Sequence, residues 1–204
     1  MSWQTGLWDH DLQTFRAWPA DARRPLSEGA WIDYVPGWLP HADALYEELH
    51  DQIAWRADER RMYDSVVAVP RLTAWFPRAE QAGNRTLLDI RDELNRHYEQ
   101  PSDPFVSAGL CLYRNGDDSV ALHGDRIGRG RHDDTLVAVL SLGSPRVFLL
   151  RPRGGGRSVR LTVGHGDLLV MGGSCQRTWD HAVPKSRRHV GARISVQYRC
   201  RGVA

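Results

Sequence analysis

The residues best suited to chemistry lie in two segments that are far apart in the sequence. His123 and Asp125 stand two positions apart, and residues i and i+2 of an extended strand point to the same face. His181 lies in a second, aromatic segment, Trp179–Pro184. Two imidazoles and one carboxylate around an ion form the facial triad that binds iron(II) in non-heme oxygenases, with three coordination positions left open. A closed zinc site would need a fourth protein ligand, and the sequence offers no good candidate.

Each member of this triad also has an ordinary interpretation when it is taken alone. A histidine in the position of His181 is more often a hydrogen-bonded core residue, and one in the position of His123 more often lies on the surface. The spacing of these residues by itself therefore leaves both interpretations open.

A second pattern lies near the end of the chain. Alternation places Arg193, Ser195, Gln197 and Arg199 on one face of a predicted strand. Arginines that point into a barrel are costly unless an anion pairs with them, and a guanidinium binds a carboxylate through two parallel hydrogen bonds. An iron-bound dicarboxylate would supply such an anion. The alternative is an edge strand whose arginines face solvent.

The elements that must position these residues follow from hydrophobic periodicity. Two helices are predicted, one that begins at Pro40 and one that runs from Asn84 to Tyr98, after a short strand over Trp31–Val35. Many short strands follow Pro104: Phe105–Tyr113, Leu136–Leu142, Arg146–Arg151, Ser158–Val163, Asp167–Met171 and Arg193–Arg199. This order predicts a mixed α+β, mainly β fold, with a double-stranded β-helix (jelly-roll) core and the N-terminal helices packed on one sheet. We expect an irregular N-terminal arm over residues 1–30 and one domain over residues 31–204.

Composition narrows the class of protein. The chain has 204 residues, a net charge of +2 and 41% hydrophobic residues, which fits one globular domain. Its three cysteines are an odd number, which argues against a disulfide framework and fits a cytoplasmic location. We see no transmembrane stretch and no secretory signal, and we expect a monomer. Three basic stretches favour either a surface for a polyanion or solvated loops: residues 126–132, 151–160 and 185–189.

Five blocks of sequence resemble one family, the AlkB nucleic-acid dealkylating dioxygenases. Most telling is the stretch from Leu112 to Asp125, which ends in the His-Gly-Asp motif. The other blocks are Pro70–Phe76, Leu140–Phe148, Gly166–Met171 with Trp179–Lys185, and Arg193–Arg199. The resemblance covers residues 31–201, and several ordered motifs with compatible spacings are far more specific than any one of them.

The resemblance implies the cofactors and the residues that hold them. The cofactors are Fe(II), 2-oxoglutarate as co-substrate, and O2. By position in the motifs, His123, Asp125 and His181 would bind the metal. Arg193 would pair with the distal carboxylate of 2-oxoglutarate, to which Tyr113 would also hydrogen-bond. Ser195 would lie beside the co-substrate, and Arg199 would approach the carboxylate that chelates the iron.

The resemblance also implies a reaction, namely oxidative dealkylation of alkylated bases in DNA, possibly RNA. It would release an aldehyde, succinate and CO2, with the base in a single strand or flipped out of a duplex. A nucleotide-recognition segment at about residues 60–85 would supply Trp75 and Phe76 for stacking and Arg71 for phosphate contacts. Core packing is the equally weighted alternative for the two aromatic residues.

Three positions depart from the family pattern. Cys111 and Ser195 stand where the family has asparagines that contact the co-substrate. Arg126, followed by Ile127, stands where repair enzymes carry acidic residues that select cationic bases. We therefore expect Arg126 to disfavour cationic lesions relative to neutral etheno adducts. The same departure favours an alternative function, in which the enzyme hydroxylates a protein or a small molecule.

Overall fold

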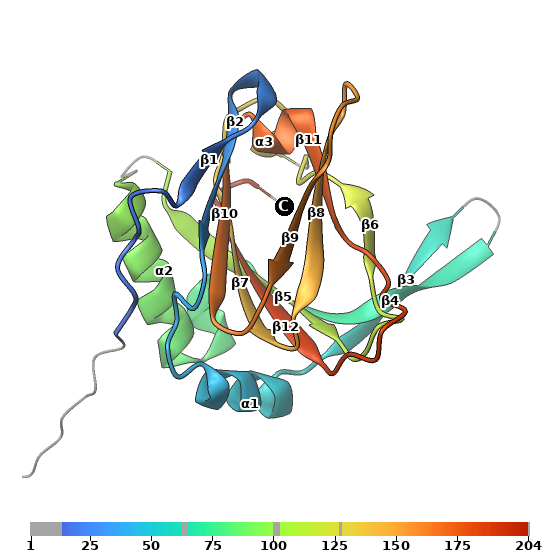
Figure 1. Cartoon of the computed structure of the whole chain (residues 1–204). Helices are drawn as coiled ribbons and strands as arrows, with labels where there is room; N and C mark the ends of the chain where they lie inside the picture. The colour runs from blue at the N-terminus through green and yellow to red at the C-terminus, as the bar shows by residue number, and fades with distance from the viewer. Residues whose placement is uncertain (1–13, 63–64, 100–102, 127, 204) are drawn as a thin grey trace, which may run out of the picture.

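The computed structural model of the chain describes residues 14–62, 65–99, 103–126 and 128–203 (Figure 1). Two antiparallel sheets face each other in it. The large sheet has the order β1-β2-β10-β7-β12-β5-β4-β3 and the small sheet the order β6-β11-β8-β9. The strands of the large sheet are β1 (Arg23–Pro25), β2 (Ala30–Val35), β3 (Arg56–Met62), β4 (Ser65–Phe76), β5 (Phe105–Tyr113), β7 (Val137–Gly143), β10 (Asp167–Gly173) and β12 (Arg193–Cys200). Those of the small sheet are β6 (Val120–His123), β8 (Arg146–Pro152), β9 (Val159–Val163) and β11 (Trp179–Val183). This is the predicted jelly-roll.

The two longer helices, α1 (Asp43–Gln52) and α2 (Arg85–Tyr98), cover the outer face of the large sheet (Figure 1). Helix α2 begins where the sequence predicts, because the Asn84 side chain accepts a hydrogen bond from the Leu87 amide at 2.9 Å. Its buried face packs on the sheet, and the Tyr198 hydroxyl donates to the Leu87 carbonyl at 3.0 Å. Helix α1 begins three residues after the predicted Pro40, because His41 has a left-handed backbone (φ 53°) that a helix cannot include.

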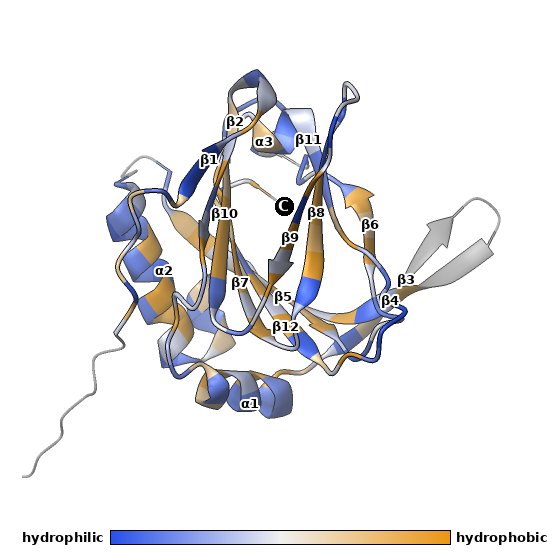
Figure 2. Ribbon diagram, in the orientation of Figure 1, coloured by the Kyte–Doolittle hydropathy of each residue, from blue (hydrophilic) through white to orange (hydrophobic). Residues whose placement is uncertain are grey.

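Alternation along the central strands divides the side chains of the large sheet between two faces. On β12, Ile194, Val196 and Tyr198 are fully buried toward the helices. The side chains between them point the other way, into the space between the two sheets. Apolar colouring follows the sheets and the inner side of α2 in Figure 2. The polar residues of β12 thus lie inside the molecule.

Several elements were not predicted, the twelve-residue strand β4 among them. Residues 23–25, assigned in advance to an irregular arm, form β1, and Arg23 anchors it with two hydrogen bonds of 2.8 Å to Asp33. Residues 1–13 of that arm lie outside the described residues. Strands β3, β4, β6 and β11 were also missed, as were a short helix, α3 (Cys175–Thr178), and the 3-10 turns η1 (Ser27–Gly29), η2 (Ala79–Ala82) and η3 (Arg129–Arg131).

All three cysteines are free thiols, as the sequence predicts. Burial raises the pKa of Cys175 and of Cys200 to about 12, so both are inert core residues. Among the described residues no helix is long and apolar enough to cross a membrane. The cytoplasmic location and the monomeric state stay predictions.

Candidate active site

The triad residues meet at one end of the small sheet. His123 ends β6 and lies opposite His181 of β11 in the strand register, so the two ring centroids are 4.3 Å apart. Asp125 follows two residues after the end of β6. One potential ligand atom from each of the three residues lies within 4.8 Å of the others. The structure therefore brings together the three residues that the sequence predicts as metal ligands.

Hydrogen bonding fixes which nitrogen of His123 faces the metal position. The Nδ1 atom lies 2.8 Å from the Ala121 carbonyl oxygen. A carbonyl only accepts, so Nδ1 must carry the proton, and Nε2 keeps a free lone pair. That Nε2 atom lies 3.9 Å from Oδ1 of Asp125. The imidazole is therefore oriented and protonated as a metal ligand requires.

His181 is a buried histidine, as its ordinary interpretation requires, but its ring points at the other two ligands. It stacks on Phe148, with the ring centroids 5.6 Å apart and the planes 11° from parallel. Burial lowers the pKa of His181 to about 3. The ring is therefore neutral at physiological pH, which is the form that binds a metal.

Asp125 is held as an anion at the centre of the site. Its backbone N–H donates to Gln176 at 3.1 Å, and Arg199 Nε donates to its Oδ2 at 2.9 Å. Burial alone would raise the pKa of Asp125, but Arg199 and the two histidines outweigh this effect and lower it to about 2. Arg199, expected beside the chelating end of the co-substrate, thus pairs with a ligand of the triad.

Arg193 is a buried cation that lacks a full set of partners. Its side chain has no exposed surface, and Nε donates to the Ser141 hydroxyl at 2.9 Å. Neither terminal nitrogen has a hydrogen-bond partner of good geometry among the described residues, although the Tyr113 ring lies 5.3 Å from the guanidinium carbon. Burial lowers the pKa of Arg193, the usual sign of a charge whose hydration has not been replaced. A bound carboxylate would supply the two missing acceptors.

A cavity between the two sheets connects these two features. Its walls include the triad, Arg199 and, next to Arg193 in the register of β5 and β12, Tyr113. Burial raises the pKa of Tyr113, so its phenol stays protonated and can donate to a carboxylate. The other lining residues are Arg71, Cys111, Val120, Val137, Val139, Phe148, Met171, Val183, Ser195 and Gln197. Among the described residues the cavity reaches Tyr113, and Arg193 lies next to Tyr113 outside the lining, so the cavity extends from the triad toward Arg193. We call this space the triad cavity.

Comparisons with known proteins agree with this geometry. Residues 34–199 match the family model of the 2OG-Fe(II) oxygenase superfamily. The chain belongs to that superfamily. Alpha-ketoglutarate-dependent dioxygenase alkB homolog 3 of Homo sapiens is 30% identical over 186 residues, which are 80% of this chain and 64% of that protein. The chain thus spans less than two thirds of the length of this relative.

Two further proteins are similar to the chain, one in sequence and one in fold. DNA oxidative demethylase ALKBH2 of Arabidopsis thaliana is 30% identical over 128 residues, 48% of this chain and 38% of that protein. The solved structure of OsALKBH1 shares the fold, with a TM-score of 0.60 at 14% identity over 86% of this chain and all of that chain. As a member of the 2OG-Fe(II) oxygenase superfamily, the chain forms an oxidoreductase domain that uses Fe(II), 2-oxoglutarate and O2.

Cys111 and Ser195, the two residues that replace asparagines of the AlkB pattern, both lie close to Gln197. Gln197 Nε2 donates to the Ser195 hydroxyl at 2.6 Å, and Cys111 Sγ lies 3.8 Å from Gln197 Oε1. Gln197 thus lies between both substituted positions, on the wall of the triad cavity. Alternation along the sequence predicts the correct face of β12 for Gln197 but indicates no role for it. Ser141, Phe148 and Gln176 were also given no role. Ser141 and Phe148 lie within the family-like block Leu140–Phe148, but the site residues that they contact are on other strands, and Gln176 lies outside the blocks.

The predicted substrate residues of the oxygenase are separated by the structure. Trp75 is 47% exposed, with the Arg199 guanidinium carbon 5.7 Å from its ring centroid. Phe76 packs against the core, which is the alternative that the sequence left open for it. Arg71 lines the triad cavity and donates to the Ser119 carbonyl at 3.3 Å. Arg126 pairs with Asp180 at 3.3 Å.

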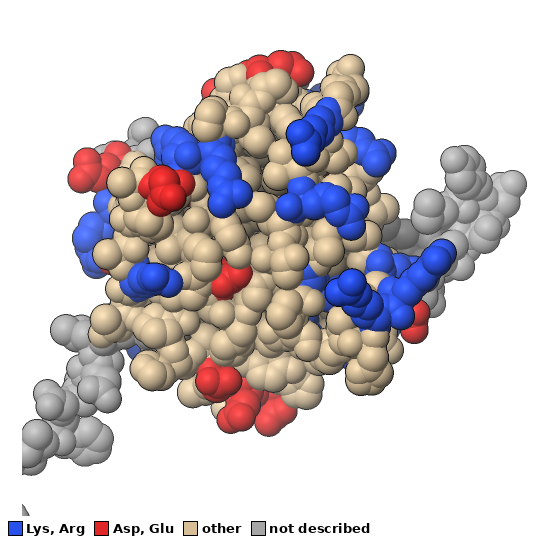
Figure 3. Space-filling view, in the orientation of Figure 1, with Lys and Arg blue, Asp and Glu red and all other residues tan. Residues whose placement is uncertain are grey.

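The basic stretches are only partly free to meet a polyanion. In the first stretch, Arg129 pairs with Asp103 and Asp133. Arginines 151, 153, 157 and 160 of the second stretch are exposed, as are Lys185, Arg187 and Arg188 of the third. Figure 3 shows basic side chains in several separate groups on one face, and acidic ones below them near α1. The charge is therefore dispersed on this face.

Proposed function

We propose that this oxygenase removes alkyl groups oxidatively from bases of nucleic acid, with DNA as its main substrate. The observation that carries the proposal is the exposed indole of Trp75 beside the triad cavity, one guanidinium away from Asp125. An exposed aromatic ring close to an oxidising site suits a planar base. The names of the relatives, including a DNA oxidative demethylase, support the same substrate class.

In this proposal the chain's own residues hold the cofactors as follows. His123, Asp125 and His181 bind Fe(II), while Arg193 and Tyr113 bind the distal carboxylate of 2-oxoglutarate. Arg199 keeps Asp125 ionised and in place through its hydrogen bond. When bound, Fe(II) with 2-oxoglutarate and O2 would add one oxygen atom to the adduct, either at a C–H bond of an alkyl carbon on a base nitrogen or across the C=C bond of an etheno bridge, with succinate and CO2 formed from 2-oxoglutarate. The hydroxylated alkyl carbon would then leave as an aldehyde, and the oxidised etheno bridge would take up water and leave as a dialdehyde, so that the base regains its N–H.

The burial of the triad sets how the substrate must approach. Asp125 and His181 are both buried, so a base within a stacked duplex is unable to reach them. The base must come from a single strand or be flipped out of a duplex. Stacking on Trp75 would repay part of the cost of unstacking, at about 1–3 kcal/mol per base.

We further propose a preference for neutral lesions, which rests on Arg126, the residue that follows Asp125. Asp180 precedes His181 in β11, and its carboxylate lies 3.3 Å from Arg126 Nη2 and 3.9 Å from Arg153 Nε. Two cations share one anion there, so the local balance is one positive charge. Like charges repel, and a cationic base such as 3-methylcytosine would therefore bind less well than a neutral etheno-adenine.

The test is removal of the lesion itself. The protein, loaded with Fe(II) and 2-oxoglutarate, is incubated with single-stranded oligonucleotides that carry either 3-methylcytosine or etheno-adenine, and the oligonucleotide mass is followed. We expect both lesions to be lost and etheno-adenine to be lost faster. Equal or faster loss of 3-methylcytosine would overturn the lesion preference. No loss of either lesion, in a preparation that converts 2-oxoglutarate, would overturn the proposed substrate class.

A further inference from the structure

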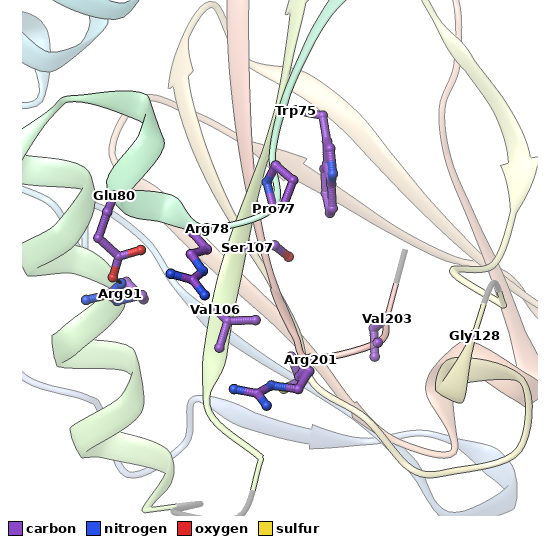
Figure 4. Close-up of a pocket in the computed structure, with 12 residues that line it drawn as sticks. Trp75, Pro77, Arg78, Glu80, Arg91, Val106, Ser107, Gly128, Arg201 and Val203 are labelled. Carbon is purple, nitrogen blue, oxygen red and sulfur yellow. Dashed lines mark hydrogen bonds and ion pairs between the residues drawn. The ribbon is translucent and has the colours of Figure 1, made fainter.

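A second, larger cavity of about 650 Å³ opens on the other side of Trp75 (Figure 4). It lies where the end of β4, the start of β5 and the end of β12 come together beside η2 and α2. The residues around it are Trp75, Pro77, Arg78, Glu80, Arg91, Val106, Ser107, Gly128, Cys200, Arg201, Gly202 and Val203. The triad lines only the first cavity, so this space, which we call the Trp75 cavity, is distinct from it.

The Trp75 cavity is lined by three arginines and one carboxylate, an excess of two positive charges. Arg78 and Arg201 are exposed, and neither forms an ion pair with any described residue. The third arginine in the lining, Arg91, is neutralised because it pairs with Glu80 and, at 2.8 Å, with Asp92. The carboxylate of the lining is therefore already occupied, and the cavity as a whole attracts an anion.

The remaining walls suit a flat apolar group. The indole of Trp75, Val106 and the buried Val203 supply apolar surface, and the guanidinium groups of Arg78 and Arg201 lie around the same opening in Figure 4. An aromatic face, apolar walls and two unpaired guanidiniums around one cavity match the two parts of a nucleotide: a base that stacks and a phosphate that pairs.

Trp75 of this cavity lies beside Arg199, which lines the triad cavity. Gly109 lies opposite Trp75 and Gln197 in the strand register. A Cβ atom at Gly109 would approach Arg199 Nη1 to 3.0 Å and Trp75 Cε3 to 3.1 Å. The glycine thus lets Trp75 settle next to Arg199, which holds Asp125. A group bound on the exposed side of Trp75 is therefore a close neighbour of a base at the triad.

We propose that the Trp75 cavity binds the nucleotide next to the alkylated one in the same strand. Its base contacts Trp75, and its phosphate pairs with Arg78 and Arg201. This inference rests on the proposed function, because it assumes that the alkylated base enters the triad cavity. An acidic peptide offers the negative charge but lacks the planar ring that the exposed indole fits, so the nucleotide is the better match.

The first experiment compares substrates of two lengths. The ratio of kcat/KM for an etheno-adenine trinucleotide to kcat/KM for the etheno-adenine nucleoside is measured for the full chain loaded with Fe(II) and 2-oxoglutarate. We expect the double variant Arg78→Glu/Arg201→Glu to lower this ratio about 10-fold or more. The matched control, Arg24→Glu, reverses an exposed charge on β1 at the opposite edge of the large sheet from β4 and should leave the ratio unchanged. An unchanged ratio in the double variant would overturn the inference.

The second experiment does not depend on turnover. Fluorescence anisotropy follows the binding of unmodified oligothymidylate to the protein loaded with Fe(II) and 2-oxoglutarate without O2, and the melting temperature of each variant confirms folding. We expect weaker binding in the double variant and unchanged binding in Arg24→Glu. Cavity-dependent binding without lesion loss would support this inference and contradict the proposed function. Two outcomes would overturn this inference and leave the proposed function intact. One is lesion loss together with unchanged oligonucleotide binding in the double variant, and the other is stronger competition by an acidic peptide than by an oligonucleotide.

Discussion

The two cavities on either side of Trp75 differ in how their charges are arranged. In the triad cavity the carboxylate of Asp125 is already paired with Arg199. The unsatisfied nitrogens there are Nε of Arg71 and, buried next to Tyr113 of the cavity wall, both terminal nitrogens of Arg193. In the Trp75 cavity the unpaired cations, Arg78 and Arg201, are exposed to solvent. A buried unpaired charge is costly, whereas an exposed one is nearly free.

This difference shows which ligand each cavity must hold. The fold retains Arg193 at a cost in stability, which is understandable only if a tightly held anion arrives in every catalytic cycle. The exposed pair costs little and suits a polymer that binds and leaves. The triad cavity is thus organised for a defined small molecule, and the Trp75 cavity for a range of sequences.

The largest effect is expected from the metal ligand at the centre of the triad cavity. Asp125→Asn keeps the shape of the side chain but removes its charge. The activation free energy should rise by several kcal/mol, so the turnover rate should fall roughly 1000-fold. Succinate formation and anaerobic Fe(II) binding measure the loss. The control Asp133→Asn changes an exposed partner of Arg129 and should keep full activity. Iron binding of normal affinity in Asp125→Asn would remove this residue from the triad.

Arg193 offers a test in which stability and binding move in opposite directions. Arg193→Met removes a buried, partly unpaired cation, so the ligand-free variant should melt at a higher temperature than the natural protein. The same change should weaken 2-oxoglutarate binding by at least about 2 kcal/mol, roughly 30-fold. Thermal melting with and without 2-oxoglutarate reads out both effects. A variant that melts lower yet keeps its response to 2-oxoglutarate would refute the assigned role.

Trp75 and Phe76 are neighbours in β4 and should separate binding from stability. Trp75→Ala removes an exposed ring, so its free energy of unfolding should change by less than about 0.5 kcal/mol, while oligonucleotide binding weakens by about 1–3 kcal/mol. Phe76→Ala removes a ring packed against the core and should cost about 2 kcal/mol of stability with binding unchanged. Urea unfolding measures the stability of each variant, and an anisotropy titration measures its oligonucleotide binding. If both variants lost stability and binding to the same extent, the assignment of Trp75 to binding and Phe76 to the core would be contradicted.

The smallest effect concerns lesion choice. Arg126→Ala leaves Asp180 with Arg153 alone and removes one positive charge near His181. Turnover of 3-methylcytosine relative to etheno-adenine should rise by a few-fold, since a partly exposed charge contributes up to about 1 kcal/mol. The control Arg160→Ala lies on β9, at the opposite edge of the small sheet from β6. An unchanged ratio in Arg126→Ala would leave lesion choice without an electrostatic cause.

The sequence predicts the main strands, both longer helices and the chemistry-bearing face of β12 well. These features depend on local periodicity, and the alternation from Arg193 to Arg199 is regular enough to assign a face to every residue. The neighbouring strands β6 and β11 were missed because they are short and contain His123, Asp180 and His181 in place of an apolar pattern. The functional residues themselves interrupt the signal that would reveal their strands.

Other features depend on residues that meet only in the folded chain. Pro70 lies within β4, where proline argues against a strand, and a register shift between β3 and β4 accommodates it. The ion pair of Arg126 with Asp180 joins residues 54 positions apart. The Trp75 cavity is assembled from the ends of three strands. Spacing along the sequence therefore does not predict which arginines, such as Arg126, form an ion pair and which, such as Arg201, do not.

The most direct test of the account is the coupling of 2-oxoglutarate turnover to a nucleic-acid lesion. Succinate and aldehyde are measured in parallel for the protein with Fe(II), 2-oxoglutarate and O2, with and without a single-stranded oligonucleotide that carries etheno-adenine. We predict that the modified oligonucleotide stimulates succinate formation and that one molecule of aldehyde product is released for each lesion lost. An unmodified oligonucleotide should not stimulate succinate formation. Slow succinate formation that no modified oligonucleotide changes would contradict the proposed substrate while leaving the oxygenase site intact.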